Sequence, residues 1–146
     1  VPGVTAALAA AADAQQPLTR RGHGRSVALT TAMTREHDLQ AGRHADTEVF
    51  YMAGKQLPGL ARQLAAAGWP ATTPVSVVSR AGWPDAIHSQ HTLDTLAQAS
   101  VLHSGRPTVV WIGAGARALP AAPAPAERPQ ADADKRARSS VLRTLP

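Results

Sequence analysis

Short apolar runs alternate along this chain with segments of helical periodicity, and this alternation limits the fold more than any other feature. Strands are expected at residues 27–32, 47–52, 75–79, 86–91 and 108–113, and helices at residues 6–16, 57–67 and 93–101. The helix at 57–67 is the best defined, because Leu57, Leu60 and Leu64 recur at helical spacing. Strands and helices alternate after Met52, so the order predicts an α/β fold with a mixed sheet flanked by helices.

The helix boundaries carry residues that are typical of helix ends. Thr5 is a favourable N-cap for the first helix, Pro58 suits the first turn of the second, and Gly68 suits its C-terminal end. The apolar face of the third helix is expected to carry Leu93, Leu96, Ala97 and Val101.

Composition narrows the class of protein further. Hydrophobic residues make up 44% of the 146 residues but aromatic residues only 3%, so Val, Leu, Ile and Ala must fill most of the core. The absence of Cys excludes disulfides, cysteine-ligated zinc and a thiol nucleophile. No run of about 18 apolar residues occurs, so we expect no membrane partner.

The positive charge of the chain is concentrated near its C-terminus. Residues 117–146 carry six basic and three acidic side chains, whereas residues 1–116 carry nine and seven. The main part of the chain is therefore close to neutral, and we expect no nucleic-acid partner despite the net charge of +5. Because residues 117–146 are rich in Pro and Ala and lack apolar periodicity, they are expected to form a disordered tail.

One glycine-rich segment matches the start of a dinucleotide-binding fingerprint. The sequence IGAGARA at residues 112–118 follows an expected strand, as that fingerprint requires. The fingerprint also needs a helix next, whose N-terminus holds the pyrophosphate, but Leu119, Pro120 and a Pro-rich segment follow. A strand end that leads into a terminal segment is therefore the favoured interpretation.

The histidines do not have the spacing of a metal site, and none is predicted. His88 and His91 lie three residues apart on an expected strand, so their side chains point to opposite faces of the sheet. His37 and His44 lie in a polar segment without zinc-ligand spacing. No catalytic nucleophile or carboxylate pair is assigned.

A compact basic loop is the remaining candidate for a functional site. It contains Arg20, Arg21 and Arg25, with glycines between them. One interpretation is a solvated loop, and the other is a clamp for carboxylates or phosphates, which the planar guanidinium group suits. The residues alone leave both alternatives open.

Several segments resemble, in the same order and spacing, those of the tetrapyrrole methylases. They are VPGVTAA at residues 1–7, PLTRRG at 17–22, TEVFYMAGK at 47–55, TPVSVVSRAGWPD at 73–85 and RPTVVWIGAGA at 106–116. The family's corresponding segments are V-P-G-[IV]-[TS]-[AS]-A, P-L-T-H-R-G, T-x-V-x-Y-M-G, T-P-V-A-V-V-x-x-G-T and a last strand that ends in V-G-x-V. Within the family, the chain is most similar to the uroporphyrinogen-III C-methyltransferases.

The resemblance implies a fold, an activity and a domain organisation. The family has two α/β domains with S-adenosylmethionine bound between them, and this chain resembles the C-terminal half. Residues 1–16 are then an interdomain linker helix, residues 17–116 the C-terminal domain and residues 117–146 a tail. The implied reaction is C-methylation of uroporphyrinogen III to precorrin-2 by S-adenosylmethionine in a cytoplasmic homodimer.

The resemblance also implies individual site residues. Thr5, Ala6, Met52 and Ala81 stand where the family contacts S-adenosylmethionine. Arg20, Arg21 and Arg25 are expected to bind the carboxylates of uroporphyrinogen III. A piece that lacks the N-terminal half is expected to bind the cofactor weakly and not to turn over.

The sequence departs from the family pattern at several positions. Arg20 replaces the His of P-L-T-H-R, Ala53 replaces the Gly after Y-M, and Ala81-Gly82 replaces the G-T pair. Two alternative functions therefore stay open. One is a family member that acts on a later corrinoid precursor or on a non-tetrapyrrole target, and the other is a non-catalytic α/β dimerisation module.

Overall fold

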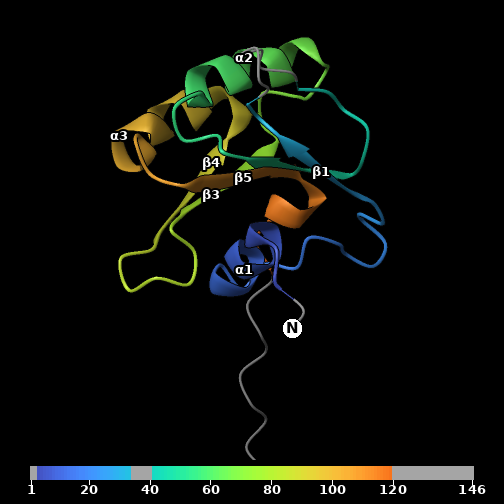
Figure 1. Cartoon of the computed structure of the whole chain (residues 1–146). Coiled ribbons are helices and arrows are strands. Elements are labelled where there is room, and N and C mark those ends of the chain that lie inside the picture. Colours follow the sequence, from blue (N-terminus) through green and yellow to red (C-terminus); the bar gives the residue numbers. More distant parts are fainter. Residues whose placement is uncertain (1–2, 34–40, 120–146) are drawn as a thin grey trace, which may run out of the picture.

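The computed structural model describes residues 3–33 and 41–119, which form one five-stranded sheet with helices on both faces (Figure 1). The elements are α1 (Ala6–Asp13), β1 (Val27–Thr31), β2 (Thr47–Tyr51), α2 (Leu57–Ala66), β3 (Pro74–Ser79), β4 (Ile87–Thr92), the 3₁₀ helix η1 (Leu93–Ala99), α3 (Ser100–His103), β5 (Thr108–Gly113) and the 3₁₀ helix η2 (Ala114–Ala116). All five predicted strands are confirmed within a residue or so. The segment predicted as a disordered tail, from residue 120 on, and His37 lie outside the described residues.

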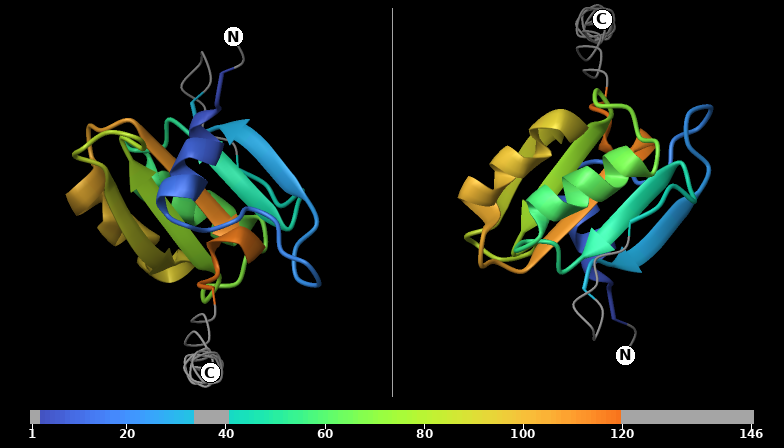
Figure 2. Two further views of the ribbon diagram at one scale, coloured as in Figure 1. Left: turned by 90° about the horizontal axis from the view of Figure 1, so that it is seen from below. Right: turned by 90° about the horizontal axis from the view of Figure 1, so that it is seen from above.

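The sheet is mixed, as predicted, with the strand order β1-β2-β5-β3-β4. Strands β1 and β2 are parallel, whereas β5 is antiparallel to both of its neighbours, β2 and β3. Because β2 and β3 are both antiparallel to β5, they run in the same direction and end at the same edge of the sheet. Figure 2 shows α2 on one face of the sheet and α1 on the other.

Strand β5 forms the centre of the core, and all six of its residues are buried. Its side chains alternate between two apolar clusters because successive residues of a strand point to opposite faces. Val110 and Ile112 pack with the leucines of α2 and η1, whereas Val109 and Trp111 pack with the alanines of α1. The small side chains of α1 allow this helix to lie close to the sheet.

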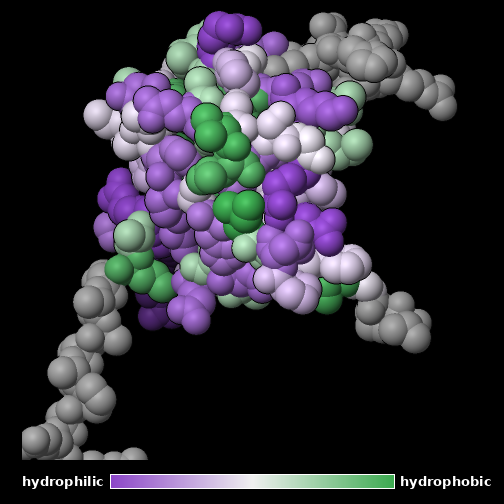
Figure 3. All heavy atoms as spheres, turned by 90° about the vertical axis from the view of Figure 1, so that its left-hand side faces the viewer, coloured by the Kyte–Doolittle hydropathy of each residue, from purple (hydrophilic) through white to green (hydrophobic). Residues whose placement is uncertain are grey.

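The segment at 93–101 differs from the single helix that was expected there. It forms the 3₁₀ helix η1 followed by the short helix α3. A 3₁₀ helix has three residues per turn, so Leu93, Leu96 and Ala99 share the buried face. The expected burial of Ala97 and Val101 is wrong, since both are exposed, Val101 to 89%. The side of the molecule that faces left in Figure 1 carries a group of apolar side chains (Figure 3).

A buried polar network joins α3 to three strands. The ring of His103 is fully buried, and its Nδ1 forms a hydrogen bond with the hydroxyl of Ser79. Its Nε2 lies 2.7 Å from the hydroxyl of Ser89, and the hydroxyl of Ser79 lies 2.9 Å from that of Thr108. Burial, with smaller contributions from His91, Arg106 and His88, lowers the pKa of His103 to about 4, so the ring is neutral at pH 7.

This network predicts a specific loss of stability in acid. The folded-state pKa of His103 lies below the ordinary value of 6.5, so its contribution is complete above about pH 6.5 and is lost as the pH falls toward 4. We expect the free energy of unfolding in urea to fall by about 2 kcal/mol between pH 7 and pH 4.5 from this group.

The matched control is His103→Gln, measured over the same pH range. This variant is less stable at pH 7, because buried hydroxyls lose a partner, but it lacks the titrating ring. Its stability therefore depends less on pH than that of the original chain. An equal pH dependence in both proteins would show that His103 is not the responsible group.

Candidate functional site

A cavity of about 380 Å³ lies at the edge of the sheet where β2 and β3 end and β5 begins. The cavity, here called the Met52 pocket, is lined by Ala6, Ala9, Tyr51, Met52, Val78, Arg80, Ala81, Trp83, Pro107, Thr108 and Val109. The strand pairing explains its position, because Ser79 pairs with Thr108 and Phe50 pairs with Val110. The residues that follow β2 and β3 must therefore lie on either side of the start of β5.

The structure brings together all four residues that were predicted to contact a cofactor. Ala6, Met52 and Ala81 line the Met52 pocket, although they are far apart in the sequence. The hydroxyl of Thr5 forms a hydrogen bond with the hydroxyl of Tyr51, which also lines this pocket. Their role in binding a cofactor stays a prediction.

Thr5 does not act through its side chain as the N-cap that the sequence suggested. It precedes α1 with extended backbone angles, but its hydroxyl makes no capping hydrogen bond. The hydroxyl is instead bonded to Tyr51 at the end of β2. A tertiary contact has thus taken the place of the local one, and it links the start of α1 to the Met52 pocket.

Two residues that line the Met52 pocket have an unusual backbone conformation. Met52 and Arg80 have φ angles of 58° and 50°, and Gln15 is the one other described non-glycine residue with a positive φ. Side chains disfavour this region, at a cost on the order of 1 kcal/mol. Each of the two directly follows the last residue of a strand, so the strain is concentrated where the chain turns beside the pocket.

The turn between β3 and β4, which carries Ala81, forms one wall of the Met52 pocket, and it contains an ion pair that the sequence analysis did not assign. The guanidinium of Arg80 lies 2.9 Å from the carboxylate of Asp85 and 4.8 Å from the centre of the Trp83 ring. The hydrogen bond from Arg80 lowers the pKa of Asp85, so that carboxylate is ionised at neutral pH. Arg106 also approaches Asp85, and the backbone N–H of Gly82 donates to Asp13 at the end of α1.

Gly54 stands one position after Ala53, the residue that replaces the family's glycine after the Y-M pair, and it has no room for a side chain. A Cβ at this position would lie 2.6 Å from the carbonyl oxygen of Arg106 and 2.9 Å from the hydroxyl of Thr108. The backbone after β2 therefore packs directly on the connection into β5. Ala53, where the family has Gly, is fully buried in the core.

We therefore expect Gly54→Ala to destabilise the protein. The new methyl group must push the Arg106 to Thr108 backbone away from β2, which costs about 1–3 kcal/mol. Gly3→Ala is the control, because a Cβ on Gly3 meets nothing within 4 Å. Urea unfolding checks the difference, and equal stabilities of the two variants would contradict this packing argument.

The arginines of the basic loop lie at the other end of the sheet. The loop precedes β1, and the backbone N–H groups of Arg25 and Ser26 donate to the carboxylate of Asp46, just before β2. Met52 follows β2, so the length of that strand separates the loop from the Met52 pocket (Figure 1). The structure thus does not bring Arg20, Arg21 and Arg25 together with the predicted cofactor residues.

The glycine-rich segment at residues 112–118 and the histidines of β4 were the other candidates for functional sites. Gly113 ends β5 and is followed by a three-residue 3₁₀ turn, not by the long helix that a dinucleotide site needs. His88 is exposed, while His91, on the opposite face of β4, bonds to the hydroxyl of Ser89. No group of metal-ligating side chains, and no helix long and apolar enough to cross a membrane, occurs within residues 3–33 and 41–119.

Comparison with known proteins identifies the family. The model of the Tetrapyrrole (Corrin/Porphyrin) Methylases matches residues 1–97. The chain is 37% identical over 108 residues to a siroheme synthase of Psychrobacter cryohalolentis and 40% identical over 113 residues to siroheme synthase 1 of Yersinia pseudotuberculosis. The chain therefore belongs to the tetrapyrrole methylase family.

Solved structures show the same fold. A cobalt-precorrin-4 methyltransferase of cobalamin biosynthesis matches with a TM-score of 0.71 and 27% identity, over 81% of this chain and 52% of that one. Uroporphyrin-III C-methyltransferase from Thermus thermophilus, in complex with S-adenosylhomocysteine, matches with a TM-score of 0.66 and 26% identity, over 77% and 51%. The two siroheme synthase alignments cover 70% and 74% of this chain but only 21% and 23% of the relatives. The chain thus spans about half of these solved structures and less than a quarter of these curated relatives.

Proposed function

We propose that this chain supplies one wall of the methyl-donor site of an S-adenosylmethionine-dependent methyltransferase that converts uroporphyrinogen III to precorrin-2. The observation that carries the proposal is that Ala6, Met52 and Ala81 line the Met52 pocket together, while Thr5 is hydrogen-bonded to Tyr51 in the pocket lining. A related structure is a complex with S-adenosylhomocysteine, which is the donor after loss of its methyl group.

The residues of the Met52 pocket suit a nucleoside. Ala6, Ala9 and Ala81 are small and leave space against the sheet, while Val78 and Val109 offer apolar surface to a planar base. The hydroxyls of Thr5 and Tyr51, which are bonded to each other, offer polar groups beside this apolar surface. S-adenosylmethionine, when bound, would supply an activated methyl group on a sulfonium.

We assign binding and orientation, rather than acid–base chemistry, to the residues of this chain. Displacement at a methyl carbon depends mainly on holding the donor and the acceptor in line, so correct positioning lowers the barrier most. The tight turns at Met52 and Arg80 fix the backbone at the pocket, and the bond between Thr5 and Tyr51 fixes the linker. No residue is assigned as a catalytic base.

Two tetrapyrroles are candidates for the methyl acceptor. The curated relatives quoted above are siroheme synthases, which favours uroporphyrinogen III. The higher TM-score of the cobalt-precorrin-4 methyltransferase makes a later corrinoid precursor the alternative.

The homodimer, the cytoplasmic location and the pairing of Arg20, Arg21 and Arg25 with substrate carboxylates remain predictions.

Titration of the ¹⁵N-labelled chain with S-adenosylhomocysteine tests the donor site. NMR detects millimolar binding, which matters because the chain spans about half of the solved relatives it resembles. We expect the largest shifts in the backbone amides of Ala6, Met52 and Ala81. Shifts that cluster instead near Asp46 and Gly113, or no shifts at millimolar ligand, would contradict the proposal.

A pair of variants separates pocket occupancy from general effects of added bulk. Ala81→Leu fills the Met52 pocket and is expected to weaken binding about tenfold or more, since the ligand and the side chain cannot occupy the same space. Ala65→Leu adds the same volume on the exposed surface of α2 and should leave the affinity unchanged.

A further inference from the structure

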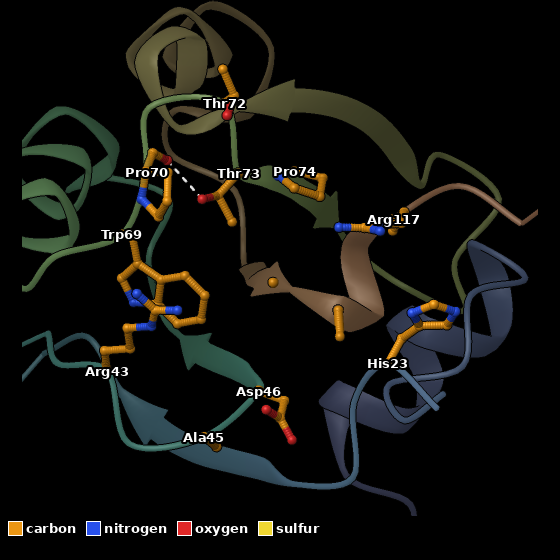
Figure 4. Close-up of a pocket in the computed structure, with 12 residues that line it drawn as sticks. His23, Arg43, Ala45, Asp46, Trp69, Pro70, Thr72, Thr73, Pro74 and Arg117 are labelled. Carbon is orange, nitrogen blue, oxygen red and sulfur yellow. Dashed lines mark hydrogen bonds between the residues drawn. The ribbon is translucent and has the colours of Figure 1, made fainter. Parts of the chain in front are cut away.

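A second cavity of about 380 Å³ lies at the opposite edge of the sheet, where β2 begins and β5 ends. This cavity, here called the Arg43 pocket, is lined by His23, Arg43, Ala45, Asp46, Trp69, Pro70, Thr72, Thr73, Pro74, Gly113, Ala114 and Arg117. Figure 4 shows Arg43 and Trp69 on one side of the cavity and Arg117 and His23 on the other. The proposed methyl-donor site makes no use of these residues.

The guanidinium of Arg43 is held in place before any ligand arrives. It lies 4.7 Å from the centre of the Trp69 ring, and one of its N–H groups donates to the carbonyl of Gly68 at 3.2 Å. The Trp69 indole N–H in turn donates to the carbonyl of Gly42 at 3.1 Å. Because Arg43 is oriented but has no acidic partner among the described residues, its remaining N–H groups are available to an anion.

Gly113 lets the end of β5 pack closely on the start of β2 beside the Arg43 pocket. A Cβ at Gly113 would lie 2.2 Å from the carbonyl oxygen of Asp46 and 3.1 Å from Trp69, and its φ of 105° also favours glycine. The glycine that resembled part of a dinucleotide fingerprint is thus explained by close packing.

Basic side chains outnumber acidic ones around this end of the sheet, where the buried carboxylate of Glu48 accepts hydrogen bonds from the backbone N–H groups of His44 and Ala45. Arg43 and Arg117 line the cavity itself, and the basic loop that carries His23 adds Arg20, Arg21 and Arg25. Asp46 is the acidic residue of the lining, and its Oδ2 already accepts hydrogen bonds from the Arg25 and Ser26 backbone and the Ser26 hydroxyl. These bonds, led by the one from Arg25, hold the pKa of Asp46 below its ordinary value, so one negative charge faces two guanidinium groups.

The neighbouring loop also has unused donors. Arg20 donates from one terminal nitrogen to the carbonyl of Ala118, but its Nε and other terminal nitrogen are buried without a partner. Buried donors without partners are costly, so an anion that reached Arg20 would be stabilised there, although Arg20 does not itself line the Arg43 pocket. The sequence had left a clamp for carboxylates or phosphates open for this loop.

We propose that the Arg43 pocket binds the phosphate group of a small phosphorylated molecule. Arg43 and Arg117 approach from opposite sides, and His23 lies beside Arg117, an arrangement that suits the several outward-facing oxygens of a phosphate. A whole tetrapyrrole macrocycle is far too large for a cavity of about 380 Å³, so the phosphate proposal concerns Arg43 and Arg117 and leaves the predicted contacts of the basic loop with substrate carboxylates unchanged. The proposal is independent of the methyl-donor assignment.

Calorimetry with inorganic phosphate and with ribose 5-phosphate, at constant ionic strength, tests the proposal. We expect both to bind and ribose 5-phosphate to bind more tightly, because the cavity is larger than a phosphate ion. Citrate serves as the carboxylate probe. Binding of citrate without binding of either phosphate would overturn the phosphate assignment, and so would the absence of any phosphate binding at millimolar concentration.

Three charge variants locate the site. Arg117→Gln and Arg43→Gln should each weaken phosphate binding about tenfold, because each removes one guanidinium group from the cavity. Arg62→Gln removes the same charge from the exposed surface of α2 and should change the affinity less than twofold. Equal weakening by Arg62→Gln and Arg117→Gln would mean that phosphate senses only the net charge, and the proposal would be wrong.

Two controls guard against trivial outcomes. Arg43 packs on Trp69, so circular dichroism is used to check that Arg43→Gln still folds. Arg117 is exposed, so Arg117→Gln tests the site even if Arg43→Gln unfolds. The amide shifts caused by S-adenosylhomocysteine should persist in Arg117→Gln, because the two pockets lie at opposite edges. Their loss in this variant would contradict the independence of the two sites.

Discussion

The pairing of β5 with β2 and β3 is the constraint on which both pockets depend. Because β5 runs antiparallel to both neighbours, the ends of β2 and β3 are placed at one edge and their beginnings at the other. The first edge holds Met52 and Arg80 on either side of Pro107 and Thr108, and the second holds Asp46 and Gly113. A slip of β5 by one residue would exchange its two buried faces and separate both sets of residues.

The two edges have different chemistry because different residues follow and precede the same strands. At the first edge the chain turns with small and apolar residues, and the one rim arginine, Arg80, is already paired with Asp85. At the second edge Arg43 and Arg117 face a single carboxylate. The first edge therefore suits a nucleoside with apolar surface, and the second suits an anion.

Much of the fold was predictable because it is encoded in local patterns. The apolar runs at 47–52 and 108–113 predicted the buried strands β2 and β5, and the spacing of Leu57, Leu60 and Leu64 predicted α2; the structure confirms all three. The error at 93–101 has a local cause, since the spacing of Leu93 and Leu96 fits both an α-helix and a 3₁₀ helix. The assigned capping role of Thr5 failed for a different reason, because its hydroxyl bonds to a residue 46 positions away.

By itself, the sequence determined the order of strands and helices, the mixed sheet and the family, since these follow from local periodicity and from motifs in a fixed order. The tertiary structure alone decided that His103 is buried and neutral among Ser79, Ser89 and Thr108. It also decided that the basic loop lies at the Arg43 pocket, away from Met52. The physical reason is that burial and charge proximity depend on which distant segments the strand pairing brings together, and periodicity carries no such information.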